Sequence, residues 1–296
     1  SVSAAPDRFR WDGLVGPQAP LYIFGIPGRK SHGVVGSVRK YLGLVAPEVM
    51  QRFEPAPPAG DPSYDSVAEL YDRVFADIRV RSDEWRWLDE RVPEGARVLD
   101  VGCGNGALLR VLAPRIAGGI GVDASVKMIE RARSHDDGGG KLRFEVIDGP
   151  TLPLPDASVD VVISLLSFRY LDWDPIMQEF ARVLAPGGRL LVVDMVAAPL
   201  GLRELPRLLR DKSRQFGQRL RHRRYHGHLA RMVGDRRWQD MLRYNPIRAI
   251  HELRWYFQSR FPGGSVETLN LGWHARVLAF DTGPFEQGRV TPQSFP

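Results

Sequence analysis

Cysteine and long apolar runs are nearly missing from this sequence. Its 296 residues include one cysteine, Cys103, which excludes an internal disulfide framework and a zinc site built from several cysteines. No run approaches the roughly 18 apolar residues of a membrane-spanning helix, and the best candidate, Val159–Phe168, has only the length of a strand. The chain starts without a charged segment followed by an apolar one, so we expect no secretory signal and a cytoplasmic location.

The overall composition and charge are those of a folded, unevenly charged protein. Hydrophobic residues make up 43% of the chain and charged residues 26%, ordinary values for a soluble globular protein with a sizeable core. The net charge is +6, but residues 199–263 carry 16 Lys and Arg against 5 Asp and Glu, which leaves −5 for the rest. This basic block indicates either an anionic partner or a solvated helical face.

The first 62 residues differ from the rest of the chain. They are rich in Pro and Gly and end in Glu54–Pro62, a run typical of a linker because proline fixes φ and removes a donor. Inside them, Val34–Phe53 has helix-like apolar spacing. We interpret residues 1–62 as an N-terminal extension that lids a site, mediates dimerisation or docks a partner. Residues 63–296 form the main domain.

The main domain alternates between strand and helix patterns. Apolar residues between Val67 and Ile78 follow one face of a helix. The expected strands cover residues 97–102, 119–123, 142–148, 159–167 and 189–196, and the expected helices cover residues 107–113, 126–133 and 175–184. Such alternation predicts a parallel sheet with helices on both faces. Helical spacing then returns in Leu202–Leu220 and Met241–Phe261, and strand-like runs at 266–271 and 275–280, joined by a turn at 272–274, close the domain.

A glycine-rich loop stands where the first expected strand gives way to a helix. In Val98–Gly106 the glycines let a ligand approach the backbone, and the helix that follows offers free N–H groups. The loop also satisfies the dinucleotide pattern G-x-G-x-x-G/A. Asp123 stands at the end of the next strand, where an acid can bind ribose hydroxyls, so it fits a dinucleotide and other ribose-containing ligands alike. Three features speak against a dinucleotide site. Asp100 stands before the loop, where an acid would repel a pyrophosphate; Asp148 is followed by Leu152–Asp156; and Arg182–Gly188 precedes the fifth strand.

On these ordered motifs the chain resembles the class I S-adenosylmethionine-dependent methyltransferases, in the branch typified by quinone-biosynthesis and natural-product enzymes. The resemblance covers Ser63 to about Val196. It implies an α/β, Rossmann-like sheet of seven mostly parallel strands, with helices on both faces and an antiparallel last strand. Residues 199–263 would then be a basic helical lid inserted between the fifth and sixth strands. The implied cofactor is S-adenosyl-L-methionine, with S-adenosyl-L-homocysteine as its product.

The resemblance also assigns cofactor-binding residues. The loop glycines would approach the methionine and ribose part, Asp100 would hold the loop and the cofactor amino group, Asp123 would accept both ribose hydroxyls, and Asp148 and Gly149 would bind adenine. Met128 and Ala124 would pack against adenine, although Met128 is equally well explained as a core residue of its helix. The full expected set is Asp100, Gly102, Cys103, Gly104, Gly106, Asp123, Ala124, Met128, Asp148, Gly149 and Ser164.

The general base is unassigned in the sequence. Related enzymes often carry His where Arg169 stands, and arginine is too basic to accept a proton. Arg169 would either pair an anionic substrate or brace its loop by bonding Asp172 or Asp174. The candidate bases and proton carriers are His251, Tyr170 and His226. His251 can also be explained as a core or lid residue, and His226 as part of a solvated helix end. The expected substrate-binding residues are Arg169, Leu165, Trp173 and Trp255. No residues have the spacing of a metal site.

Three functions follow as hypotheses. The first is methyl transfer to a hydroxyl of a natural-product or quinone-like small molecule by in-line displacement, with an acidic or carrier-bound acceptor favoured by the arginine excess. The second is methylation of RNA or protein through the basic insertion, which the lack of a recognisable RNA-binding module makes less attractive. The third is a cofactor-binding protein with a cyclase-like or structural role. A homodimer is also compatible with the extension.

Overall fold

The protein was analysed as a computed structural model, which describes residues 64–136, 138–198, 201–211, 213, 223–241, 247–272 and 275–284. The predicted N-terminal extension, its helical segment at Val34–Phe53 and the tip of the predicted turn at 273–274 lie outside these residues. No helix in the described part of the chain combines the length and the apolarity that crossing a bilayer requires.

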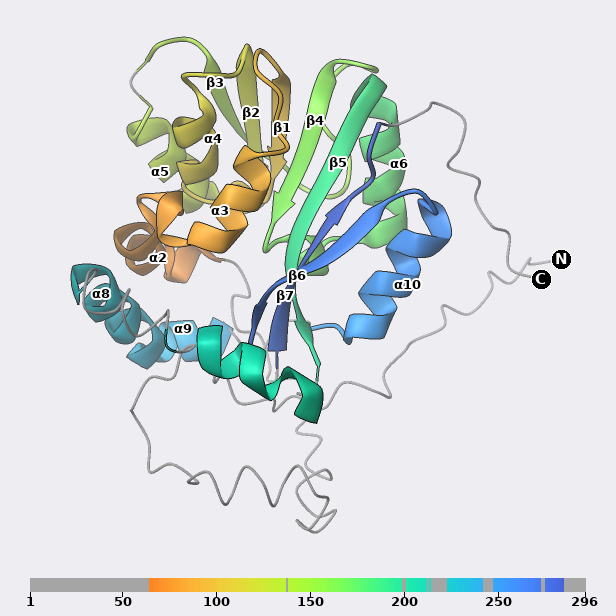
Figure 1. Cartoon of the computed structure of the whole chain (residues 1–296). Coiled ribbons are helices and arrows are strands. Elements are labelled where there is room, and N and C mark those ends of the chain that lie inside the picture. The colour runs from red at the N-terminus through yellow and green to blue at the C-terminus, as the bar shows by residue number, and fades with distance from the viewer. Residues whose placement is uncertain are drawn as a thin grey trace, which may run out of the picture. The chain divides into compact units, whose positions relative to one another are not determined.

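A single seven-stranded sheet organises the domain, with the strand order β3-β2-β1-β4-β5-β7-β6 (Figure 1). Strands β1 to β5 run parallel, and β7 runs antiparallel to both of its neighbours, β5 and β6. The predicted sheet, with its antiparallel last strand, is therefore confirmed. The strands are β1 (Arg97–Val101), β2 (Gly118–Asp123), β3 (Leu142–Val146), β4 (Val159–Leu165), β5 (Leu184–Ala197), β6 (Ser265–Leu271) and β7 (Ala275–Asp281).

Helices cover both faces of the sheet, and each face has its own apolar cluster. On one face α3 (Ser82–Asp89), α4 (Ala107–Leu112) and α5 (Val126–Ser134) supply residues such as Leu88, Leu109 and Ile129. On the other face α6 (Trp173–Val183) and α10 (Ile250–Arg260) supply Phe180 and Phe257. Two-sided burial explains why the central strands are almost continuously apolar.

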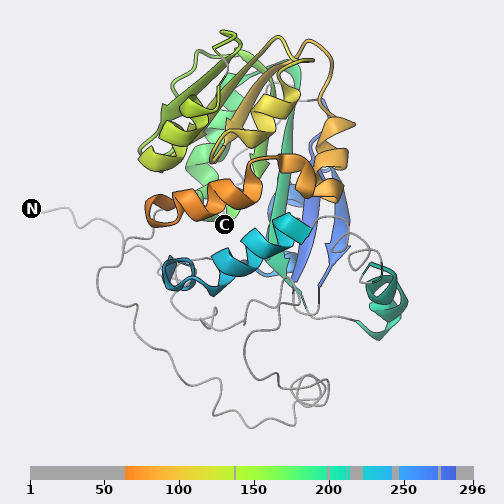
Figure 2. The ribbon, with the colours of Figure 1, turned by 90° about the vertical axis from the view of Figure 1, so that its left-hand side faces the viewer.

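A third cluster joins helices from distant parts of the chain into a cap. It is formed by α2 (Ala68–Phe75), α8 (Arg223–Gly234) and α9 (Arg236–Met241), with the preceding turn η2 (Tyr64–Ser66) packed against it. Figure 2 shows α2 and α8 side by side. The cap is tied to the loop after β1 and to the start of α5, because Asn105 donates to Asp72 at 2.8 Å and the amide of Lys127 donates to Asp65 at 3.1 Å.

Three helical stretches follow β5: residues 205–211, the α8–α9 pair, and α10. The chain segment that contains residues 205–211 and the α8–α9 pair has both of its ends at the sheet. Ala197 forms an isolated parallel bridge with Ala249, and the amide of Ala197 donates to the carbonyl of Arg248 at 2.8 Å. The helical insertion after β5 therefore leaves and rejoins the sheet at one place. Its predicted helix at Met241–Phe261 corresponds to the end of α9 and to α10.

One predicted boundary is wrong. The sequence predicts a break between Leu184 and Arg189, but β5 already begins at Leu184. The extra residues form an irregularity in the pairing of β4 with β5 rather than a break in the chain. Gly187 has a φ of +78°, and a Cβ on Gly188 would lie 2.8 Å from the carbonyl oxygen of Asp160, so both glycines are required by the strand itself.

Candidate active site

The glycine loop lies at the carboxyl end of β1, and two of its glycines are required by packing within the protein. A Cβ on Gly102 would lie 2.2 Å from the Cβ of Ser167, whose hydroxyl donates to the Val101 carbonyl at 2.6 Å. A Cβ on Gly106 would lie 2.7 Å from the ring of Phe144. The loop thus fits tightly between the segment after β4 and strand β3.

Gly104 is the loop glycine with space above it. Its φ is +53°, and the nearest atom to a Cβ added at this position would be Cε1 of Tyr71, at 3.5 Å. Its amide donates to Oδ2 of Asp123 at 2.9 Å. The loop backbone is therefore fixed by Asp123 at the end of β2, and its other side faces Tyr71 of α2.

Asp123 is held in place by backbone amides. Its Oδ2 accepts from Gly104, and its Oδ1 accepts from the amide of Ser125 at 2.9 Å. Burial raises the pKa of this carboxyl, and the two amide bonds oppose that rise. Because each carboxylate oxygen can accept more than one bond, Asp123 keeps acceptor capacity for a pair of ligand hydroxyls such as those of a ribose.

Asp100 is a buried carboxyl without a complete set of partners. Its side chain is 2% exposed, and Oδ1 has no hydrogen-bond partner in the structure. Burial, and then the neighbouring charge of Asp123, raise its pKa to about 8. A buried oxygen without a donor is costly, and an amino group bound beside it would supply one. The residues present therefore fit the amino acid and ribose parts of S-adenosylmethionine.

The expected adenine-binding residues lie at the ends of β2 and β3. Ala124, Asp148 and Gly149 are exposed, and Gly149 has a φ of +92°. Met128 is 1% exposed, so its side chain is covered by protein, in keeping with the alternative of a core residue on α5. Three exposed groups are thus available to a ligand at this edge, and the fourth is buried.

Other expected residues lie behind the loop. Ser164 is fully buried on β4, and its hydroxyl is 2.7 Å from that of Ser167. Cys103 is 8% exposed, and burial raises the pKa of its thiol well above its ordinary value. Leu165 packs against the apolar cluster of α3, α4 and α5. These three side chains support the loop from within the protein.

Arg169 forms a buried ion pair that sequence reasoning misses. Its partner is Asp194 on β5, and not Asp172 or Asp174; the Arg169 amide also donates to Oδ2 of Asp194 at 2.7 Å. Both side chains are buried, at 6% and 0% exposure, and Asp174 instead accepts from Arg260 and Tyr256. A lone acid within an apolar strand needs a buried cation. Asp194 in the apolar strand β5 was therefore the feature of the sequence from which a buried ion pair could have been predicted.

Aromatic side chains gather between this ion pair and the glycine loop. The hydroxyls of Tyr64 and Tyr170 lie 3.2 Å apart, and Nη2 of Arg169 donates to Tyr170 at 3.4 Å. The ring of Tyr64 makes edge contacts with Tyr71, Tyr170 and Trp238 at 5.8, 6.1 and 6.2 Å. Sequence reasoning singles out Tyr170 but misses Tyr64, since nothing in the sequence brings residues 106 positions apart together.

The remaining expected residues lie elsewhere. Trp173 stacks on Phe168 at 5.3 Å and donates to its carbonyl, within the apolar cluster of α6 and α10. Trp255 is 56% exposed and His251 is also exposed on α10, so the core position considered for His251 is wrong. His226 is half-buried on α8 with its ring 5.0 Å from that of Tyr225, and α8 is part of the cap.

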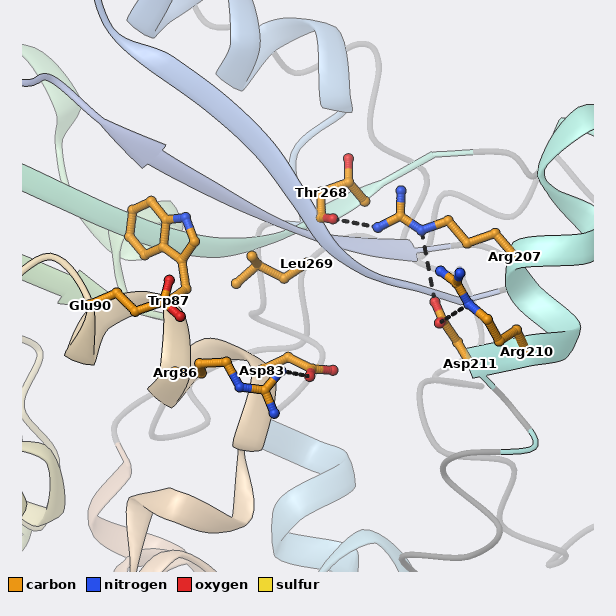
Figure 3. Close-up of a pocket in the computed structure, with 9 residues that line it drawn as sticks. All are labelled: Asp83, Arg86, Trp87, Glu90, Arg207, Arg210, Asp211, Thr268 and Leu269. Carbon is orange, nitrogen blue, oxygen red and sulfur yellow. Dashed lines mark hydrogen bonds and ion pairs between the residues drawn. The ribbon is translucent and has the colours of Figure 1, made fainter.

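A separate pocket of about 260 Å³ lies between α3, β6 and residues 205–211 (Figure 3). Its arginines point toward its carboxylates: Arg86 lies 4.0 Å from Asp83, and Arg210 lies 3.9 Å from Asp211. None of its lining residues belongs to the glycine loop or its surroundings. Among the described residues, no group of three or more His, Cys, Asp or Glu side chains has the arrangement of a metal site.

Comparison with known proteins agrees with the geometry. Residues 99–192 match the family model described as a methyltransferase domain. The chain is 33% identical over 172 residues to 27-O-demethylrifamycin SV methyltransferase of Amycolatopsis mediterranei, covering 50% of this chain and 63% of the relative. It is 35% identical over 144 residues to demethylmenaquinone methyltransferase of Thermus thermophilus, covering 47% and 64%. The match thus spans less than two thirds of either relative.

A solved structure shares the fold. Phosphoethanolamine N-methyltransferase 2 of Haemonchus contortus, in complex with phosphomonomethylethanolamine and S-adenosylhomocysteine, superposes with a TM-score of 0.51 at 15% identity. The superposition covers 75% of this chain and 57% of that one.

Proposed function

Because this chain carries a class I S-adenosylmethionine-dependent methyltransferase domain, we propose that it transfers a methyl group to a hydroxyl of a small natural-product or quinone-like molecule. The observation that carries the proposal is the pair of carboxyls at the ends of β1 and β2. Asp123 is fixed by the amides of Gly104 and Ser125 with acceptor capacity to spare, and Asp100 is buried beside it with an unpartnered oxygen.

Each group of this site has a distinct task in the proposal. When bound, S-adenosylmethionine supplies an electrophilic methyl group on a sulfonium. Asp123 accepts the ribose hydroxyls, Asp100 accepts the amino group, and Asp148 with Gly149 receives the adenine edge. The protein's contribution to the reaction is alignment and exclusion of water, which together account for a large share of the rate enhancement of a displacement.

The cap supports the choice of a small acceptor. Helices α8 and α9 of the insertion share an apolar cluster with α2, and α2 is bonded to the loop after β1, which supports the proposal that the insertion at 199–263 acts as a lid. The names of the two relatives, which denote a rifamycin and a menaquinone precursor as acceptors, favour a hydroxyl or quinone-like acceptor here. A homodimer and a cytoplasmic location stay predictions.

Calorimetric titration with S-adenosylmethionine and S-adenosylhomocysteine tests the proposal. We expect micromolar binding to the wild type and its loss in Asp123→Ala. Asp160→Ala is the matched control, because Asp160 pairs with Arg97 at the opposite end of the strands. An acceptor screen then seeks a product heavier by one methylene, the net gain of methylation. Absence of cofactor binding by the wild type contradicts the proposal, whereas binding with a product of unchanged mass favours the cyclase-like alternative.

A further inference from the structure

The two tyrosine hydroxyls beside Arg169 form a hydrogen-bonding pair with one proton left over. Tyr64 and Tyr170 carry two phenolic protons, and their mutual bond at 3.2 Å uses one of them. Arg169 donates to the Tyr170 oxygen at 3.4 Å, so this oxygen is already an acceptor. Whichever tyrosine donates to the other, one phenolic O–H remains for a third oxygen.

The pair lies next to the proposed cofactor site. Tyr64 contacts the ring of Tyr71, and Tyr71 is the side chain that approaches Gly104 of the loop. Burial raises the pKa of Tyr71, and after Arg81 the charges of Asp123, Asp100 and Arg169 also act on this pKa, so Tyr71 is within electrostatic range of both carboxyls and of Arg169. Tyr170 is 37% exposed, so this member of the pair is accessible from outside the core, whereas Tyr64 lies deeper.

The charged and titratable groups around the pair come from several elements. Tyr64 and Asp65 belong to η2, Tyr71 to α2, Arg169 and Tyr170 to η4 (Phe168–Tyr170), and Asp194 to β5, and the indole of Trp238 on α9 contacts the ring of Tyr64. Asp194 neutralises Arg169, and the carboxyl of Asp65 bonds to Ser125 and Lys127. Burial raises the pKa of Tyr64 well above its ordinary value, so this phenol is a proton donor at neutral pH.

We propose that the phenolic O–H left over by the Tyr64–Tyr170 pair binds the acceptor oxygen in its ionised form, which makes the substrate class phenols and enols acidic enough to lose their proton near neutral pH. The inference rests on the proposed methyl transfer and specifies its acceptor. None of the ring contacts and hydrogen bonds of the pair given above is with an imidazole, and Asp100 and Asp123 serve the cofactor in the proposed function. Arg169 is a positioning residue, because its bond directs the Tyr170 hydroxyl.

The reaction balances without a protein base. The acceptor hydroxyl gives its proton to water before it binds, and the tyrosine pair holds the resulting oxyanion. An oxygen lone pair then forms the new O–CH₃ bond as the methyl–sulfur bond breaks and its electron pair returns to sulfur. The negative oxygen and the positive sulfonium become a neutral ether and a neutral thioether, so no proton has to be removed during the displacement.

The binding test uses 4-nitrophenol, whose phenolate absorbs differently from the phenol and forms near neutral pH. With S-adenosylhomocysteine bound, we expect the wild-type protein to bind the phenolate about tenfold more tightly than the phenol. The double variant Tyr64→Phe/Tyr170→Phe should remove most of this preference, and Tyr64→Phe, Tyr170→Phe and Arg169→Lys alone should each reduce it. Tyr256→Phe is the control, since it also removes a tyrosine hydroxyl bond, to Asp174, but on the other face of the sheet.

The kinetic test follows once an acceptor is known from the screen. We expect kcat/KM to fall by about 10- to 100-fold in Tyr170→Phe, and the pH midpoint of kcat/KM to follow the acidity of the acceptor across a substituted series. A midpoint that stays fixed, or equal phenolate preference in the wild type and Tyr170→Phe, overturns the inference. If S-adenosylhomocysteine itself does not bind, the proposed function fails first; if it binds and the phenolate preference is absent, only this inference fails.

Discussion

Cofactor binding should release a proton from Asp100. In the free protein, burial and the charge of Asp123 place its pKa at about 8. An amino group carrying a positive charge beside this carboxyl favours its ionised form and lowers the pKa. At pH 7 about nine tenths of the free protein holds the proton, so binding should release about 0.9 proton per ligand, falling to about 0.1 at pH 9.

The same linkage predicts the pH dependence of affinity. Because the carboxyl must lose its proton to bind the amino group, affinity should rise by about tenfold between pH 7 and pH 9 and level off above the pKa of the free protein. Removing the carboxyl in Asp100→Asn should abolish this dependence. Any ionisation of the ligand's own amine appears equally in both proteins and can be subtracted.

Calorimetry with S-adenosylhomocysteine in phosphate and in Tris, two buffers with different ionisation heats, measures the released protons directly. The difference between the wild type and Asp100→Asn gives the contribution of this carboxyl. Asp123→Asn separates any proton released from the second acid, whose pKa burial also raises. Equal proton release by the wild type and Asp100→Asn at pH 7 would refute the reasoning.

Three further predictions concern stability. Asp100→Asn should raise the free energy of unfolding by up to about 4 kcal/mol at pH 7. The native pKa of Asp100 is higher than that of an ordinary aspartate, so this residue lowers stability progressively as the pH rises from the ordinary value toward the native one. An unchanged melting temperature would contradict this prediction. Gly102→Ala should lower the free energy of unfolding in urea by about 2–4 kcal/mol, and adding Ser167→Gly should restore only part, since the positive φ remains. Arg169→Met should lower the free energy of unfolding by about 3–5 kcal/mol, because Asp194 is left buried without a cation. Adding Asp194→Leu should recover most of this loss. An Arg169→Met variant as stable as the wild type would exclude a structural role for the pair.

The sheet could be predicted from the sequence because its signals are local. Each strand is a short apolar run bounded by turn residues, and β1, β2 and β3 end within two residues of the expected positions. The glycine loop and Asp123 follow from the same local pattern. The start of β5 could not be predicted, because Gly187 and Gly188 normally end an element and here are accommodated by pairing with β4.

The surroundings of the loop depend on contacts between distant residues. The sequence suggests nearby acids as partners of Arg169, but its partner on β5 is 25 positions away and becomes a neighbour only when β4 and β5 pair. Tyr64 meets Tyr170 only because η2 folds over the strand ends. The residues of the local motifs were therefore accessible to sequence reasoning, whereas the tyrosine pair needed the assembled fold.

The bridge between Ala197 and Ala249 has a consequence for how this protein can diversify. Since the chain departs from and returns to the sheet at adjacent backbone positions, the described residues between these positions form a side branch with a fixed base, which packs on α2 through α8 and α9. A branch with a fixed base can lengthen, shorten or be exchanged between homologues while the registers of β5 and β7 stay as they are. On the proposed function, grafting this branch would change acceptor preference while the glycine loop and Asp123 keep their places at the ends of the strands.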